Sequence, residues 1–166
     1  MRVVVTSDTH IGRRRRSPIP AALLSACEGA DLILHAGDVT DPAVLEELAG
    51  YAPLAAVHGN VDGWDMVERL PARRVVDVGG VDIGMVHDAG QAAGRAARLR
   101  GRFPSCRVVV FGHTHEPLCE WDAGLLLLNP GSPTERRRAP RHTYAELTVD
   151  DGDVAARIVP IDKDAP

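Results

Sequence analysis

The chain has 166 residues, 45% of them hydrophobic but only 4% aromatic, and carries a formal net charge of -4. This length predicts a single domain, residues 1–166, with a core that needs no disulfides. The negative charge disfavours a general nucleic-acid-binding surface, and no apolar run approaches the ~20 residues of a membrane-spanning helix.

The first half of the chain predicts alternating strands and helices. Expected strands cover residues 1–6, 31–35 and 54–57, and expected helices cover residues 18–28 and 41–49. Gly29 follows the end of the first helix, and Asp41 and Pro42 supply the cap and first residue of the second. This order favours parallel strands, whose ligands gather beyond their carboxyl ends.

The second half predicts mostly short strands. A helical turn is expected at 64–69, a helix at 91–99, and strands at 73–78, 81–86, 107–111, 118–121, 125–128, 143–149 and 154–158. Gly79-Gly80 and the turns at 122–124 and 150–152 predict antiparallel hairpins. A core rich in aliphatic residues suits strands buried between helices, so the predicted fold class is α/β.

The cysteines bear on the compartment. Cys27, Cys106 and Cys119 are an odd set without CxxC spacing, which favours a reducing compartment over a disulfide framework. The opening residues lack a charged segment, a long apolar segment and a cleavage site. We therefore expect a cytoplasmic protein.

Metal-competent side chains follow five of the predicted strands. They are Asp8 and His10, Asp38, Asn60 and Asp62, His87, and His113 and His115. Side chains at i and i+2 of an extended segment point to the same side, so each pair can offer two ligands to one site. A lone histidine is more often structural, as we expect for His35 and His142, but the joint pattern indicates metal chemistry.

The order of these residues resembles the calcineurin-like metallophosphoesterase superfamily. Its blocks D-x-H, G-D, G-N-x-[DE], H and G-H-x-H stand here at residues 8–10, 37–38, 59–62, 87 and 112–115. Further blocks at 34–38 and 129–132 resemble its small single-domain bacterial and archaeal phosphodiesterases. The resemblance implies a four-layer αββα sandwich of two mixed β-sheets flanked by helices.

The same resemblance implies a dinuclear metal centre. One ion would be held by Asp8, His10 and His115 and the other by Asn60, His87 and His113, with Asp38 bridging both. In that arrangement Asp38, Asn60 and His113 also position the substrate or the attacking hydroxide through the metals.

The ligand types fix the charge of such a site. Two divalent ions bring four positive charges and the carboxylates of Asp8 and Asp38 remove two, which leaves about +2 for a hydroxide and a phosphoester. Carboxylate, amide and imidazole ligands without thiolate favour Mn first, with Fe, Co, Ni or Zn as alternatives. The expected reaction is phosphodiester hydrolysis by a metal-bridging hydroxide.

Three positions refine this expectation. Val61 stands where many superfamily members carry a histidine that protonates the leaving group, so activated diesters suit the chain better than monoesters. His58 is a weaker candidate for that acid. Asp62 is expected to orient a ligand or an active-site histidine. Asp88, where a glycine is usual, is either a loop acid or a carboxylate at the rim of the site.

Two arginine clusters follow metal-site blocks, at residues 13–16 and at residues 136–138 with Arg141. Because guanidinium groups pair bidentately with phosphate, Arg13, Arg14, Arg137 and Arg141 are candidate substrate-binding residues. The alternative is a pair of solvated, exposed loops.

Two other functions compete with the phosphodiesterase. The fold also resembles the retromer scaffold subunit, which serves protein interaction and has degraded metal ligands, whereas every ligand position here has a competent residue. A nuclease is disfavoured by the net charge. The expected partner is a small phosphoester substrate; the sequence leaves a homo-oligomer open.

Overall fold

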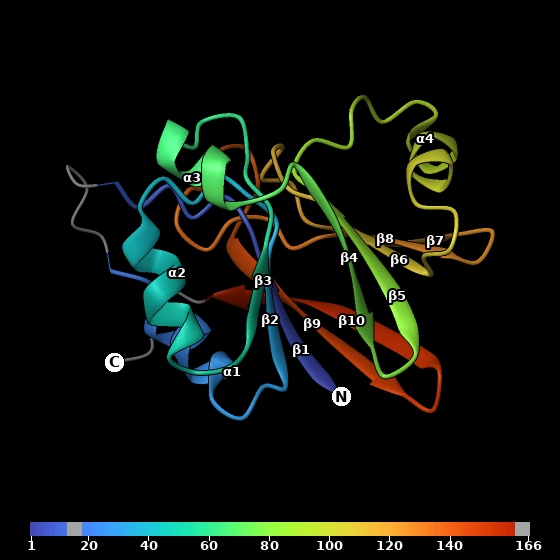
Figure 1. Cartoon of the computed structure of the whole chain (residues 1–166), viewed down its shortest axis with the longest axis horizontal. Helices are drawn as coiled ribbons and strands as arrows, with labels where there is room; N and C mark the ends of the chain where they lie inside the picture. Colours follow the sequence, from blue (N-terminus) through green and yellow to red (C-terminus); the bar gives the residue numbers. More distant parts are fainter. Residues whose placement is uncertain (13–17, 162–166) are drawn as a thin grey trace.

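The computed structural model describes residues 1–12 and 18–161, which form two mixed five-stranded β-sheets packed face to face (Figure 1). Helices cover the outer faces of the two sheets. The chain therefore has the predicted α/β sandwich of four layers.

The first sheet joins strands from both ends of the chain. Its strands are β1 (Arg2–Thr6), β2 (Leu32–His35), β3 (Leu54–Ala56), β9 (His142–Asp150) and β10 (Asp153–Ile161). The order is β10-β9-β1-β2-β3, in which β1, β2 and β3 run parallel and β9 pairs antiparallel with β1 and β10. The predicted β-α-β-α-β opening is confirmed.

The second sheet is built from the middle of the chain. Its strands are β4 (Arg73–Val78), β5 (Val81–Val86), β6 (Val108–Val110), β7 (Leu118–Asp122) and β8 (Leu125–Asn129). The order is β4-β5-β6-β8-β7, with β5, β6 and β8 parallel. Antiparallel hairpins join β4 to β5 through a turn at residues 79–80 and β7 to β8 through a turn at residues 123–124. In the first sheet, β9 and β10 are joined in the same way at residues 151–152. All three turns have positive φ at both central residues, as a type I′ turn requires.

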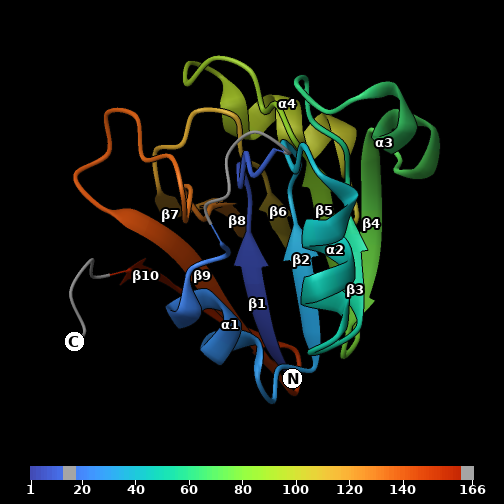
Figure 2. The ribbon, with the colours of Figure 1, turned by 90° about the vertical axis from the view of Figure 1, so that its left-hand side faces the viewer.

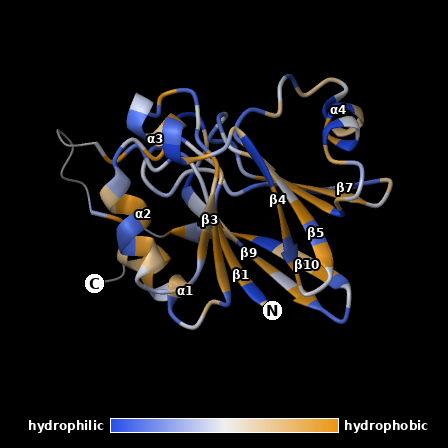
Figure 3. Ribbon diagram, viewed as in Figure 1, coloured by the Kyte–Doolittle hydropathy of each residue, from blue (hydrophilic) through white to orange (hydrophobic). Residues whose placement is uncertain are grey.

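Successive side chains of β1 point into two different hydrophobic clusters. Val3 and Val5 point into the apolar cluster between the two sheets, whereas Val4 joins the cluster under the helices of the first sheet, and all three are fully buried. A third cluster lies between the second sheet and its helix. The central strands β1, β2, β6 and β8 are buried on both faces and are nearly continuous runs of hydrophobic residues (Figure 3).

The helices are α1 (Ala21–Cys27), α2 (Pro42–Ala49), α3 (Trp64–Arg69) and α4 (Arg95–Arg102). α2 begins as predicted, with the Asp41 carboxylate accepting from the backbone N–H of Ala43. α1 is shorter than the expected 18–28, because Pro20 is extended with ψ 133 and only caps the helix. α4 is displaced from the expected 91–99, because Gly94 adopts a left-handed φ of 69 and blocks extension toward residue 91.

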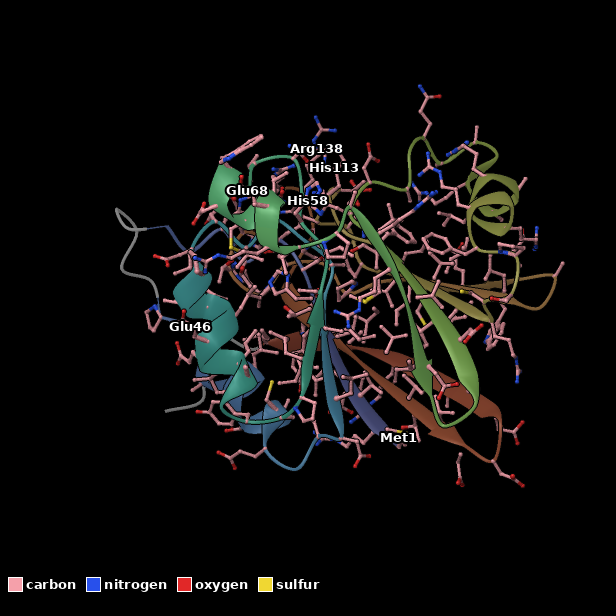
Figure 4. All side chains as sticks on the ribbon, viewed as in Figure 1. Met1, Glu46, His58, Glu68, His113 and Arg138 are labelled. Atoms are coloured by element: carbon pink, nitrogen blue, oxygen red, sulfur yellow. The ribbon has the colours of Figure 1, made fainter. Side chains whose placement is uncertain are left out.

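The carboxyl ends of the parallel strands in the first sheet lie side by side. β1, β2 and β3 all run toward the same edge, away from Met1 (Figure 2; Figure 4). Loops after β5 and β6 meet them there, where His58, His113 and Arg138 are labelled in Figure 4. None of the helices in the described ranges is long and apolar enough to cross a membrane.

Candidate metal centre

Five loops at the carboxyl ends of β1, β2, β3, β5 and β6 bring together all seven residues predicted as metal ligands. Six of them form two groups of three. The first group is Asp8, His10 and His115, and the second is Asp38, His87 and His113; within each group the ligand atoms all lie within 4.8 Å of one another. These groups match the sets expected from the sequence, with Asn60 beside the second.

The first group is almost fully enclosed. His10 Nε2 lies 3.2 Å from His115 Nε2, and the imidazole rings stack with their centroids 5.0 Å apart. Asp8 Oδ1 lies 3.3 Å from His115 Nε2 and 3.8 Å from His10 Nε2. Asp8 and His115 are fully buried. Two imidazole nitrogens and a carboxylate oxygen therefore converge on one point.

The second group is equally tight. His87 Nε2 lies 3.2 Å from Asp38 Oδ2 and 3.2 Å from Asn60 Oδ1. His113 Nδ1 lies 2.9 Å from the same Asn60 oxygen. The amide of Asn60 thus adds a neutral oxygen donor to the carboxylate and two imidazoles.

One carboxylate oxygen faces both groups. Asp38 Oδ2 lies 3.6 Å from His10 Nε2 of the first group and 3.2 Å from His87 Nε2 of the second. Asp38 is 1% exposed, and its other oxygen accepts from the backbone N–H of Val61 at 3.1 Å. This geometry suits a carboxylate shared between two cations.

Backbone carbonyls orient two of the imidazoles. His87 Nδ1 donates to Ala36 O at 2.7 Å, and His115 Nδ1 donates to the carbonyl oxygen of Glu135. In a neutral imidazole, a ring nitrogen that donates to a carbonyl fixes the tautomer, so the opposite nitrogen carries the lone pair that a metal would accept. The folded chain thereby holds both rings ready to bind a metal.

The ligand loops are held in an unfavourable backbone conformation. Asp8, His10, Asp38, His113 and His115 all have positive φ, between 45 and 71. Each such non-glycine residue costs about 1–3 kcal/mol, and residues of this kind cluster at functional sites. The strain lets each side chain turn back toward its group at the strand end.

Two motif glycines leave room for the carboxylates. A Cβ on Gly59 would lie 2.0 Å from Asp38 Oδ1, and one on Gly112 would lie 2.6 Å from Asp8 Oδ2. Any other residue at either position would displace a ligand.

Burial and charge set the protonation of the site. Burial alone would raise the pKa of Asp38, but its hydrogen bond with His87 and the charge of that ring lower it to about 2. Burial would likewise lower the pKa of His87, yet the hydrogen bond with Asp38 and the charge of Asp8 raise it. For His10 burial prevails and lowers the pKa. The carboxylate is therefore anionic at neutral pH, and a cation beside it would replace the proton that His87 shares with it.

This donor set fits two divalent first-row ions. The separations between ligand atoms within each group, from 2.9 to 3.8 Å, are those of atoms that share a cation at about 2.1 Å. Within residues 1–12 and 18–161, the ion-pair contacts of the buried Asp8 and Asp38 carboxylates are with histidines, so cations would supply the missing positive charge.

Asp62 acts on the backbone of the Asp38 loop. Its carboxylate accepts from the N–H groups of Gly59 at 2.7 Å, Thr40 at 2.8 Å and Asp38 at 3.1 Å. It thus joins the Asn60 and Asp38 loops.

The structure also places the two histidines expected to be structural and two residues whose role was left open. His35 is fully buried and accepts from the backbone N–H of Gly37, and His142 Nε2 donates to the carbonyl of Thr134. His58 Nδ1 faces its neighbour's carbonyl at 3.3 Å. Asp88 is an exposed loop acid that accepts from the N–H of Gly90 at 2.7 Å.

The structure describes two of the four arginines that were candidates for binding the substrate. Arg137 Nη1 donates to the backbone carbonyl of His113 at 3.2 Å, so it borders the second group. Arg141 is exposed just before β9. Arg13 and Arg14 lie outside the described residues.

Sequence reasoning gave no role to the hydroxyl groups of Ser132 and Thr134, in the loop after Asn129. Ser132 Oγ donates to the carbonyl of Asp8 at 2.7 Å, and Thr134 Oγ1 donates to the carbonyl of Thr9. The Asn-Pro-Gly-Ser block at 129–132 was the available signal, but its contacts reach more than 120 residues back along the chain.

Comparison with known proteins agrees with this geometry. A model of the calcineurin-like phosphoesterase superfamily domain matches residues 1–152. A probable metallophosphoesterase of Methanocaldococcus jannaschii is 36% identical over 166 residues, covering 98% of this chain and 83% of that protein. Another, from Methanothermobacter thermautotrophicus, is 40% identical over 139 residues, covering 82% and 80%.

A solved structure agrees in fold. Wild-type Vps29 of Entamoeba histolytica, complexed with Zn²⁺, superposes with a TM-score of 0.76 over 96% of this chain and 99% of that one, at 22% identity. Such identity shows a shared fold and no more. Together with the family model and the archaeal relatives, it leads to one conclusion: the chain belongs to the calcineurin-like phosphoesterase superfamily.

Proposed function

We propose that this protein is a dinuclear metal-dependent phosphodiesterase that hydrolyses a phosphodiester or nucleotide-like substrate. The observation that carries the proposal is the position of Asp38 Oδ2, which faces a histidine of each ligand group at 3.6 and 3.2 Å. A shared carboxylate is the feature that turns two separate metal sites into one catalytic pair.

The ligands proposed for the first ion are Asp8, His10 and His115, and those for the second are Asn60, His87 and His113, with Asp38 common to both. Two divalent ions bound there supply Lewis acidity that activates water and stabilises the charge that grows on the phosphoryl oxygens. We propose Mn as the native metal ahead of Fe, Co, Ni and Zn.

The residues of the chain supply orientation and charge. Asp38, Asn60 and His113 are proposed to position the substrate or the attacking hydroxide through the metals, and Asp62 holds the Asp38 loop through three backbone N–H groups. The two ligating carboxylates leave a net charge of about +2, which favours an anionic substrate.

Val61 supports the preference for diesters. Its side chain is 47% exposed and has no proton to donate. Without a general acid, about 10²–10⁴ in rate is lost for a poor leaving group, so substrates with acidic leaving groups are favoured.

Arg137 is proposed to bind the substrate phosphate. Its guanidinium already lies against the backbone of His113, a ligand of the second group. Guanidinium groups suit phosphate because they can pair with two of its oxygens. Arg13, Arg14 and Arg141 remain candidates on the basis of the sequence.

A protein-interaction scaffold is the second candidate function, because Vps29 structures share this fold. The complete set of metal-competent residues favours catalysis. A nuclease is the third candidate, disfavoured by the net charge of -4. The three unpaired cysteines support a cytoplasmic location.

The test is hydrolysis of bis-p-nitrophenyl phosphate and of the monoester p-nitrophenyl phosphate by metal-stripped protein refilled with Mn, Fe, Co, Ni or Zn. We expect metal-dependent turnover that favours the diester and collapses in Asp38→Asn. The matched control is Asp41→Asn, which changes a carboxylate that caps α2. Failure of every metal to support turnover, or an Asp38→Asn variant as active as the wild type, would contradict the proposal.

A further inference from the structure

The loop after β8 lies directly beside the first ligand group, and one of its residues carries a carboxylate that the family motifs do not include. We propose that the carboxylate of Glu135 is an additional ligand of the ion held by Asp8, His10 and His115. This inference rests on the proposed two-metal function.

The backbone of Glu135 is fixed between two residues of that group. Its N–H donates to Ser132 Oγ at 2.9 Å, and the same hydroxyl donates to the carbonyl of Asp8 at 2.7 Å. The carbonyl of Glu135 accepts from His115 Nδ1. All three hydrogen bonds use backbone atoms of Glu135 or the Ser132 hydroxyl, so they can persist when the Glu135 carboxylate is replaced.

From this anchor the side chain reaches the third residue of the group. Glu135 Oε2 lies 3.9 Å from His10 Nε2, the nitrogen that also faces His115 and Asp38. Two atoms that bind one ion at about 2.1 Å lie roughly 3.0 Å apart when adjacent and 4.2 Å apart when opposite. The 3.9 Å separation between Glu135 Oε2 and His10 Nε2 falls within that window. Glu135 is not in the group whose ligand atoms all lie within 4.8 Å of one another, so its partly exposed side chain would turn toward the ion as the ion binds.

Exposure suits a ligand on the open side of the ion. The Glu135 side chain is 36% exposed, compared with 12% for His10 and none for Asp8. The buried residues would hold the ion from below, and Glu135 would approach from the solvent side. Its carboxylate would add a negative charge, leaving about +1 rather than +2 on the loaded centre.

The competing interpretation is that Glu135 only secures the loop or pairs with an arginine near it. The two interpretations differ in what the carboxylate does to metal affinity. An extra anionic ligand tightens the binding of one ion, whereas a loop contact affects stability and leaves metal affinity unchanged.

The experiment compares Glu135→Gln with the wild type in metal-stripped protein titrated with Mn²⁺ or Co²⁺, by calorimetry and by competition with a chelator. The matched control is Glu116→Gln, which neutralises an exposed glutamate directly after His115. We expect Glu135→Gln to weaken one of the two ions by about 10- to 100-fold and to alter the visible spectrum of the Co²⁺ form, while Glu116→Gln matches the wild type.

Two results would overturn the inference: two ions bound by Glu135→Gln within twofold of wild-type affinity, or an equal loss in Glu116→Gln. Unfolding of the metal-free variants shows whether the loop is intact, and its hydrogen bonds through backbone atoms predict that it is. Wild-type protein that binds two ions while Glu135→Gln behaves identically would refute this inference alone. Wild-type protein that binds none would instead refute the proposed function.

Discussion

Replacing Gly59 by alanine is expected to disable the metal centre through a single methyl group. The added Cβ would lie 2.0 Å from Asp38 Oδ1, 2.8 Å from its Cγ and 2.5 Å from its backbone nitrogen, where real Cβ contacts essentially never fall below 3.0 Å. The carboxylate must therefore retreat by about 1 Å, and rotation of the side chain alone cannot relieve the contact with the backbone nitrogen. Metal sites tolerate ligand displacements of only about 0.2 Å.

The expected losses follow from that displacement. Forcing a methyl group into this packed position costs about 1–3 kcal/mol of stability. A misplacement of about 1 Å at a catalytic group can cost about 10²-fold in rate, so diester hydrolysis should fall at least that far. Because Asp38 serves both groups, we expect the affinity for both ions to fall.

The assay combines metal content, diester hydrolysis and thermal unfolding. Gly101→Ala is the matched control, since a Cβ at this position in α4 meets no atom within 4 Å and should stabilise the helix by up to about 1 kcal/mol. Gly59→Ala protein that binds two ions with wild-type affinity would refute the packing argument.

Three further changes test other parts of the account. Burial lowers the pKa of His35 to about 4, so the stability that its neutral form contributes is complete above pH 6.5 and is lost as pH falls through 4. The free energy of unfolding of the metal-free protein, measured with denaturant, should fall by up to about 3 kcal/mol over that window, and the same loss in His35→Asn would contradict this origin. Leu99→Ala removes the fully buried side chain of α4 and should lower the free energy of unfolding by about 2–5 kcal/mol without changing metal stoichiometry. A smaller loss, or a changed stoichiometry, would count against the packing described. Asp62→Asn replaces one of the two carboxylate oxygens that accept from three backbone N–H groups, so it should lower the free energy of unfolding by about 1–3 kcal/mol and weaken metal binding. Unfolding and metal binding like those of the wild type would show that the loops keep their positions without this carboxylate.

The sequence was sufficient to locate the strands and the ligand loops. The turns at 79–80, 122–124 and 150–152 are local signals from which the hairpins were predicted, and Gly29, Asp41 and Pro42 marked the helix ends of the opening β-α-β-α-β unit. The pairs Asp8 with His10 and His113 with His115 were recognisable by their spacing, but the extended backbone assumed for them is wrong: all four residues have positive φ, and His113 and His115 belong to different groups.

Other features depend on contacts between distant segments. The start of α4 was misplaced because the pattern at 91–99 does not reveal that Gly94 is left-handed. Ser132 contacts Asp8 across 124 positions, and Glu135 approaches His10 because the loop after β8 of the second sheet meets the loop after β1 of the first. The strained φ values at the ligands are likewise imposed by tertiary packing, not by local preference.

The most direct test of the central claim is electron paramagnetic resonance of the protein refilled with Mn²⁺, read together with its metal content. The position of Asp38 Oδ2 between the two groups predicts two ions per chain with magnetically coupled spectra, and loss of that coupling in Asp38→Asn. One ion per chain, or two ions with uncoupled spectra in the wild type, would contradict a shared carboxylate at the centre of this site.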